Sequence, residues 1–122
     1  MTSPKPRWPD AFAIVRRVGL AMPGVTEETK YDGTPVLKAA GSFMAGIATD
    51  EEADANSLVV RCEFEDRELL LEDAPDVYYV TGYHERHPVV LARLEHLNED
   101  ALRDLLSVSR RLAIDKMARK PR

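Results

Sequence analysis

Cysteine, aromatic residues and long apolar runs are scarce in this chain, and each shortage excludes a class of protein. The single cysteine, Cys62, excludes an internal disulfide and so a disulfide-stabilised module. Aromatic residues make up only 7% of the 122 residues, and no stretch approaches the roughly 18 consecutive apolar residues of a membrane-spanning helix. The first ten residues, MTSPKPRWPD, lack the apolar segment of a secretory signal. We therefore expect a cytoplasmic protein that does not enter a membrane.

Short catalytic and cofactor motifs are also missing. The patterns GxxxxGK[ST], GxGxxG, HExxH and GxSxG do not occur. We therefore predict no catalytic residue, no metal and no cofactor. The hydrophobic fraction of 44% is enough for one core, and a chain of this length is typical of a single domain.

The net charge of −4 conceals an uneven distribution along the chain. Residues 23–100 contain eighteen acidic and six basic residues, whereas residues 1–22 and 101–122 are both basic overall. An anionic ligand should therefore prefer a surface that includes the terminal regions. The isoelectric point near 5.4 is far below the value above about 9 that is typical of a DNA-binding domain. Binding to nucleic acid would require a locally basic patch.

Apolar spacing and turn residues predict three helices and five strands. Three early prolines predict a flexible arm over residues 1–9, followed by one domain over 10–118 and a basic tail over 119–122. Helices are expected over residues 10–22 and 66–72 and from Asn98 onward, each beginning at a capping residue: Asp10, Asp66 and Asn98. Strands are expected over residues 35–40, 42–49, 57–63, 77–81 and 89–94. The acidic segment 50–56 is expected to be a mobile loop.

This order, α-β(3)-α-β(2)-α, predicts the fold class. Connections of hairpin length indicate an antiparallel sheet. Because a sheet with one apolar face must bury that face, we expect the helices to cover it and form a two-layer α+β domain.

A spaced set of turn and core motifs resembles a known family, the MmcQ/YjbR-like proteins, which are small bacterial domains often described as DNA-binding. The motifs run from Ala11 to Met117, and we list them in chain order: Met22-Pro23-Gly24-Val25, residues 30–35 (KYDGTP), residues 41–45 (GSFMA), Ala74-Pro75, residues 83–90 (YHERHPVV) and residues 105–112 (LLSVSRRL). The resemblance implies a fold similar to secretion chaperones. It also implies DNA binding, by likeness to a double-wing transcription-factor domain.

Eight residues are candidates for contacting nucleic acid or another anion. Phosphate groups are bound by several Lys or Arg side chains on one surface, often with aromatic side chains between them. Lys38 and Arg61 alternate with apolar neighbours on expected strands, so we predict that they share the solvent face of the sheet. The full candidate set is Lys30, Lys38, Arg61, Tyr83, Arg86, Arg93, Arg110 and Arg111.

The lead hypothesis is thus a non-enzymatic binding domain with a DNA-binding or regulatory role. One alternative is a protein-partner module, in which a sheet or helix face binds a peptide or a second copy of the chain. A further alternative is a small-ligand binder or an enzyme that uses His84 and His87. The last alternative predicts a pocket flanked by both imidazoles.

Overall fold

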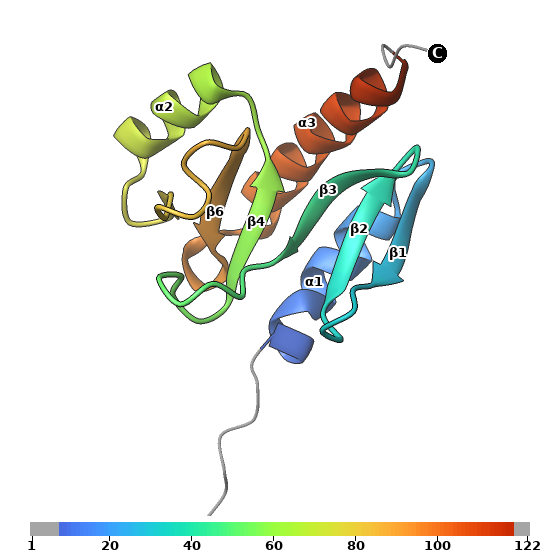
Figure 1. The fold of residues 1–122 in the computed structure, drawn as a ribbon, viewed down its shortest axis with the longest axis horizontal. Helices are drawn as coiled ribbons and strands as arrows, with labels where there is room; N and C mark the ends of the chain where they lie inside the picture. The colour runs from blue at the N-terminus through green and yellow to red at the C-terminus, as the bar shows by residue number, and fades with distance from the viewer. Residues whose placement is uncertain (1–7, 119–122) are drawn as a thin grey trace, which may run out of the picture.

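The structure, a computed structural model, describes residues 8–118 and contains three α-helices and six strands within them (Figure 1). The predicted basic tail and the first seven residues of the predicted arm lie outside these residues. The elements follow one another as α1 (Trp8–Leu20), β1 (Val25–Thr29), β2 (Pro35–Ala39), β3 (Ser42–Ile47), β4 (Ser57–Arg61), α2 (Phe64–Asp73), β5 (Tyr78–Tyr79), β6 (Val89–Arg93), the 3-10 turn η1 (Leu94–His96) and α3 (Glu99–Ala118).

The strands form one antiparallel sheet in the order β1-β2-β3-β4-β6-β5. The predicted α+β class with an antiparallel sheet is confirmed, but the predicted number of strands is wrong. β1 is additional, so the order is α-β(4)-α-β(2)-α. Its sequence, VTEET, buries only Val25, because β1 is an edge strand that pairs with β2 alone. A strand with so little apolar alternation gives almost no periodic signal.

Several predicted element boundaries also differ from the structure. α1 begins at Trp8 rather than Asp10 and includes Pro9, which is tolerated because first-turn N–H groups have no helical partner. α2 begins at Phe64, so Asp66 lies in its first turn instead of capping it. The predicted cap of α3 is confirmed, since the Asn98 Oδ1 accepts a hydrogen bond from the Ala101 N–H at 2.8 Å.

One face of the sheet is covered by α1 and α3, which lie side by side (Figure 1). Phe12 of α1 and Leu106 of α3 are fully buried in this layer. They belong to the same apolar cluster as Leu37, Leu58 and Val60, which the strand alternation places on the covered face. This cluster is the main hydrophobic core. No helix within residues 8–118 covers the opposite face of the sheet, which we call the open face (Figure 1).

A bulge in β3 sets which residues reach the open face. The pairing with β2 shifts so that Leu37 is opposite Ala45 and Lys38 is opposite Phe43, which leaves Met44 as the extra residue. The Met44 carbonyl accepts a buried hydrogen bond of 2.7 Å from the Ser109 hydroxyl of α3. The bulge therefore has a fixed partner in the helix layer.

Candidate functional site: a cavity on the open face

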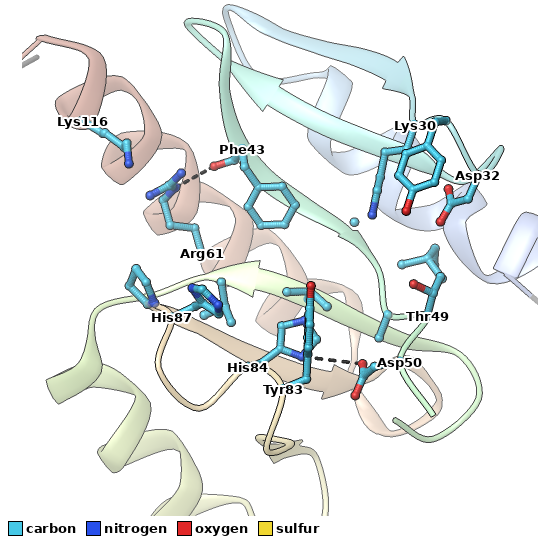
Figure 2. A pocket seen from close by; sticks show the side chains of 17 residues that line it. Lys30, Asp32, Phe43, Thr49, Asp50, Arg61, Tyr83, His84, His87 and Lys116 are labelled. Carbon is cyan, nitrogen blue, oxygen red and sulfur yellow. Dashed lines mark hydrogen bonds and ion pairs between the residues drawn. The ribbon is translucent and has the colours of Figure 1, made fainter. Parts of the chain in front are cut away.

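The open face carries a second, smaller apolar cluster. Val59, Val89 and Leu91 are buried there, and Phe43 and Tyr79 pack against them half-buried. The β1–β2 turn and the loop over residues 82–88 surround this cluster and form a cavity of about 590 Å³ (Figure 2). A volume of this size lies within the usual range for small-ligand sites.

The β1–β2 turn brings Lys30 and Tyr31 to the edge of the cavity. It is closed by two backbone hydrogen bonds between Lys30 and the residues Gly33 and Thr34. Gly33 has a φ of +89°, which a residue with a side chain rarely adopts. The Asp32 carboxylate accepts hydrogen bonds from the Thr34 N–H and hydroxyl, which lower the pKa of Asp32. This tight turn leaves the Tyr31 side chain fully exposed.

Arg61, at the end of β4, lines the same cavity. Its Nε donates to the Phe43 carbonyl at 2.7 Å (Figure 2). Its Nη2 donates to the Ser42 hydroxyl at 3.1 Å. Both acceptors are neutral, and no ion pair among the described side chains, those of residues 11–118, involves Arg61. Burial lowers the pKa of Arg61, because desolvation disfavours the charged form. A half-buried cation that lacks a carboxylate partner is well suited to meet an anionic ligand.

The loop over residues 82–88 is held in place by Arg67, a buried residue of α2. The Arg67 guanidinium donates to the carbonyls of Glu85 at 2.9 Å, His87 at 3.0 Å and Val89 at 3.0 Å. Arg67 was not among the residues predicted from the sequence. The available signal was a lone cation within a strongly acidic helix, FEDRELLLED.

Two histidines of this loop, His84 and His87, line the cavity, as the small-ligand hypothesis predicted. His84 Nδ1 lies 3.6 Å from the Asp50 Oδ1 (Figure 2). The same nitrogen lies 3.1 Å from the Thr81 hydroxyl. Burial lowers the pKa of His84, partly offset by the Asp50 carboxylate. The lowered pKa favours the neutral imidazole. Because Nδ1 faces Asp50 and Thr81, Nε2 is the ring nitrogen available to a ligand.

Asp50 and Tyr83 complete the surroundings of His84. Both Asp50 carboxylate oxygens are buried without a hydrogen-bond partner among the described residues. The Tyr83 ring stands edge-on to His84, with ring centroids 4.8 Å apart, and its side chain is 70% exposed. Two exposed tyrosines, Tyr31 and Tyr83, thus stand at the cavity, one from each loop that surrounds it.

The acidic segment over residues 50–56, which was expected to be a mobile loop, makes hydrogen bonds to residues 79 and 82 of the same chain. The Asp54 N–H donates to the Tyr79 hydroxyl at 2.8 Å, and the Gly82 N–H donates to the Glu52 carboxylate at 2.9 Å. These contacts fix the base of the loop that carries Asp50.

The structure brings three of the eight predicted anion-binding residues to the cavity: Lys30, Arg61 and Tyr83. Lys116 of α3 joins them and was missed, because the helical pattern places it with other exposed cations and gives no sign that it reaches the cavity.

The other five predicted residues do not line the cavity. Lys38 shares the open face but pairs with Glu28 at 2.9 Å, and Arg93 pairs with Asp54 at 2.7 Å. Arg86 is exposed on the loop over residues 82–88. The remaining two, Arg110 and Arg111, belong to α3 in the helix layer, where the Arg110 Nε donates to the Pro23 carbonyl at 2.7 Å.

The part of the chain that the structure describes, residues 8–118, lacks two further features. No group of three His, Cys, Asp or Glu side chains in this range is placed to hold a metal ion. No helix in the same range is long and apolar enough to cross a bilayer.

Comparison with known proteins supports the resemblance seen in the sequence. The model of the YjbR family matches residues 20–112. The chain belongs to the YjbR family. Apart from Lys116, every residue that lines the cavity lies within the segment matched to YjbR. No curated protein and no solved structure matches the chain.

Proposed function

We propose that this protein is a non-enzymatic binding domain that takes a phosphate-bearing ligand, a nucleotide unit, in the open-face cavity. Arg61 is the observation that carries the proposal. It lines a cavity of about 590 Å³ and engages only neutral acceptors. A phosphate at this position would receive charge-assisted hydrogen bonds without displacing a carboxylate.

The charges around the cavity support an anionic ligand although the molecule as a whole is acidic. Lys30 and Lys116 line it together with Arg61. Of the two carboxylates that line it, Asp32 is engaged by Thr34, and the oxygens of Asp50 are buried. The three cations therefore outnumber the one exposed carboxylate of the lining, that of Asp32, which supports a locally basic patch of the kind that an acidic chain needs.

The aromatic and apolar side chains support a planar ring as the second part of the ligand. Phe43 and Val59 line the cavity, and the exposed rings of Tyr31 and Tyr83 stand at it. Stacking of a nucleobase on an aromatic side chain contributes about 1–3 kcal/mol per base. A nucleotide unit combines this ring with a phosphate.

The cations outside the cavity bear on whether the ligand is a duplex, a single strand or a free nucleotide. Lys38 and Arg93, which would extend a basic patch along the open face, are already paired with Glu28 and Asp54. A double helix needs a long row of available cations, whereas a single-stranded segment or a free nucleotide needs only a few. We therefore favour a single-stranded end or a free nucleotide over duplex DNA.

We also propose binding without catalysis. His84 has an orienting carboxylate, Asp50, as a general base would. However, the hydroxyl that hydrogen-bonds to its ring among the described residues is that of Thr81, which occupies Nδ1 on the side that faces Asp50. A nucleophile would need to stand at the other ring nitrogen.

Fluorescence anisotropy with three probes tests the proposal at about 50 mM salt and micromolar protein. The probes are a fluorescein-labelled single-stranded oligonucleotide, the same oligonucleotide as a duplex, and a labelled mononucleotide; inorganic phosphate serves as a competitor. We expect saturable binding of the single strand or the mononucleotide, weaker binding of the duplex, and affinity that falls as salt rises.

Arg61→Met and Lys38→Met provide matched variants. Arg61→Met should weaken binding about tenfold, which corresponds to about 1.4 kcal/mol. Lys38→Met, which removes a paired cation from the same face, should leave the affinity within about twofold. Absence of saturable binding for all three probes, or equal losses in both variants, would rule the proposal out.

A further inference from the structure

A second hollow, about 390 Å³ in volume, lies between α2 and α3, on the helix side of the sheet. We call it the α2–α3 groove. Most of the side chains that line it are apolar, namely Leu69, Leu70, Tyr78, Leu105 and Val108. Cys62 also lines it, and burial raises the pKa of its thiol to about 11, so the sulfur stays protonated and adds to the apolar surface.

α2 exposes more apolar surface at this groove than the fold requires. Its three consecutive leucines, residues 69–71, project about 100° apart around the helix, so one face of the sheet cannot bury all of them. Leu70 and Leu71 pack against the core, whereas Leu69, which lines the groove, is 58% exposed. Large apolar side chains exposed beside an apolar hollow are typical of interaction sites.

The groove lies beside a strongly acidic helix, and its own lining includes two carboxylates, Asp66 and Asp104, and one cation, Arg61. The acidic residues of α2 are Glu65, Asp66, Glu68, Glu72 and Asp73, and Asp104 faces them from α3. None of these carboxylates takes part in an ion pair among the side chains of residues 11–118, which the structure describes. Arg67 is directed inward to backbone carbonyls, and Arg61 is the basic residue that lines the groove. A partner with positive charge would be complementary to this margin.

From these observations we propose that the α2–α3 groove binds a basic segment of a partner protein, with one large apolar side chain of that segment inserted beside Leu69. The apolar lining supplies the buried contact, and the acidic margin supplies orientation and selects against acidic partners. The site is separate from the nucleotide cavity except at Arg61, which lines both.

A labelled peptide composed of lysine and leucine, patterned as an amphipathic helix, is a suitable probe. We expect saturable binding to the intact protein in fluorescence anisotropy, and a loss of affinity as salt rises. A lysine–serine peptide of equal charge and a glutamate–leucine peptide of equal apolar pattern should both bind at least about tenfold more weakly.

Leu69→Ser and Leu20→Ser are the matched variants. Leu20 is also a partly exposed leucine, at 41%, but it lies at the end of α1 away from the groove. We expect Leu69→Ser to weaken binding of the lysine–leucine peptide about tenfold and Leu20→Ser to leave it unchanged. Thermal unfolding and nucleotide binding of both variants report whether the fold and the open-face cavity are intact, so failure here is distinguishable from failure of the proposed function.

Three outcomes would overturn this inference. The first is equal binding by Leu69→Ser and Leu20→Ser. The second is equal binding of the basic and acidic leucine peptides. The third is a dimer of the intact protein in light scattering that Leu69→Ser disrupts, because the groove would then be covered by a second copy of the chain.

Discussion

The two faces of the sheet differ in how completely they are covered. On the covered face, Phe12 and Leu106 pack against Leu37, Leu58 and Val60, and all five side chains are fully buried. On the open face, a smaller cluster lies under a cavity bordered by charged and aromatic side chains. We therefore expect the covered face of this small domain to supply most of its stability, because that face buries most of the apolar side chains. The other face is thereby free to keep a hollow that would be a defect in a core.

Truncation of a large side chain on each face is the strongest test of this comparison. We expect Phe12→Ala to lower the free energy of unfolding by about 3–5 kcal/mol, because its fully buried ring leaves a cavity. Phe43→Ala on the open face should cost about 1–2 kcal/mol, since its ring is only half-buried. Urea denaturation followed by circular dichroism measures both. Equal losses would contradict the assignment of stability to the covered face.

Arg67→Met tests what holds the loop at the open face. The substitution leaves the carbonyls of Glu85, His87 and Val89 without their buried donor, and we expect a loss of about 2–4 kcal/mol. Hydrogen exchange should accelerate over residues 82–88 in particular. Arg86→Met, at an exposed position of the same loop, should change stability by no more than about 0.5 kcal/mol. A similar effect of both variants would show that the loop does not depend on Arg67.

Ser109→Ala tests the link between the helix layer and the bulge. Loss of the hydroxyl leaves the buried Met44 carbonyl unpaired, which should cost about 1–2 kcal/mol in denaturant unfolding. Ser107→Ala changes the same residue type at an exposed position of the same helix and should have almost no effect. If the two variants unfold alike, the hydrogen bond to the bulge contributes nothing measurable.

The smallest expected effect is a pH dependence of the free energy of unfolding, which arises from His84 on the open face. Burial lowers the pKa of His84 in the folded protein, so the unfolded chain binds more protons as the pH falls below about 6.5. The free energy of unfolding should therefore fall as the pH is lowered through this range, down to the lowered pKa of His84. The nearby charged and titratable groups are Asp50, His87, Lys30 and Tyr83.

Ligand affinity should depend on pH in the opposite direction to the free energy of unfolding. An anionic ligand stabilises the imidazolium, so nucleotide affinity should rise as the pH falls through the same range. His84→Gln should reduce both slopes, whereas His96→Gln, which changes a histidine outside the cavity, should leave them unchanged. Urea titrations and anisotropy between about pH 5 and 8 measure the two slopes. Parallel behaviour of His84→Gln and the intact protein would assign the dependence to other groups.

The fold was predictable from the sequence wherever periodicity was strong, and it was missed where an element is mostly exposed. The amphipathic spacing of α3, its cap at Asn98 and the turn at Gly41 were all visible in the residues. β1 was missed because four of its five residues are not buried. The start of α1 was placed too late because Pro9 was taken as excluded from helix, although the first turn accepts it.

The candidate site was predictable only in part. Residue types identified Lys30, Arg61 and Tyr83, and the small-ligand alternative predicted a pocket flanked by His84 and His87. Pairing of Lys38 with Glu28 depends on the register of the missed strand β1, and pairing of Arg93 with Asp54 depends on how the acidic loop folds back. Such long-range pairings decide which cations remain available, and no local pattern encodes them.

The two edges of the sheet have a consequence for how other molecules can approach. The outer edge at β1 carries Glu27, bonded to Arg16 at 2.6 Å, and Glu28, paired with Lys38. The other edge, β5, is only two residues long. Charged or very short edge strands discourage strand-to-strand association, which protects a sheet from aggregation. We therefore expect partners of this domain to recognise its side chains, in the cavity or in the α2–α3 groove, rather than to add a strand to the sheet.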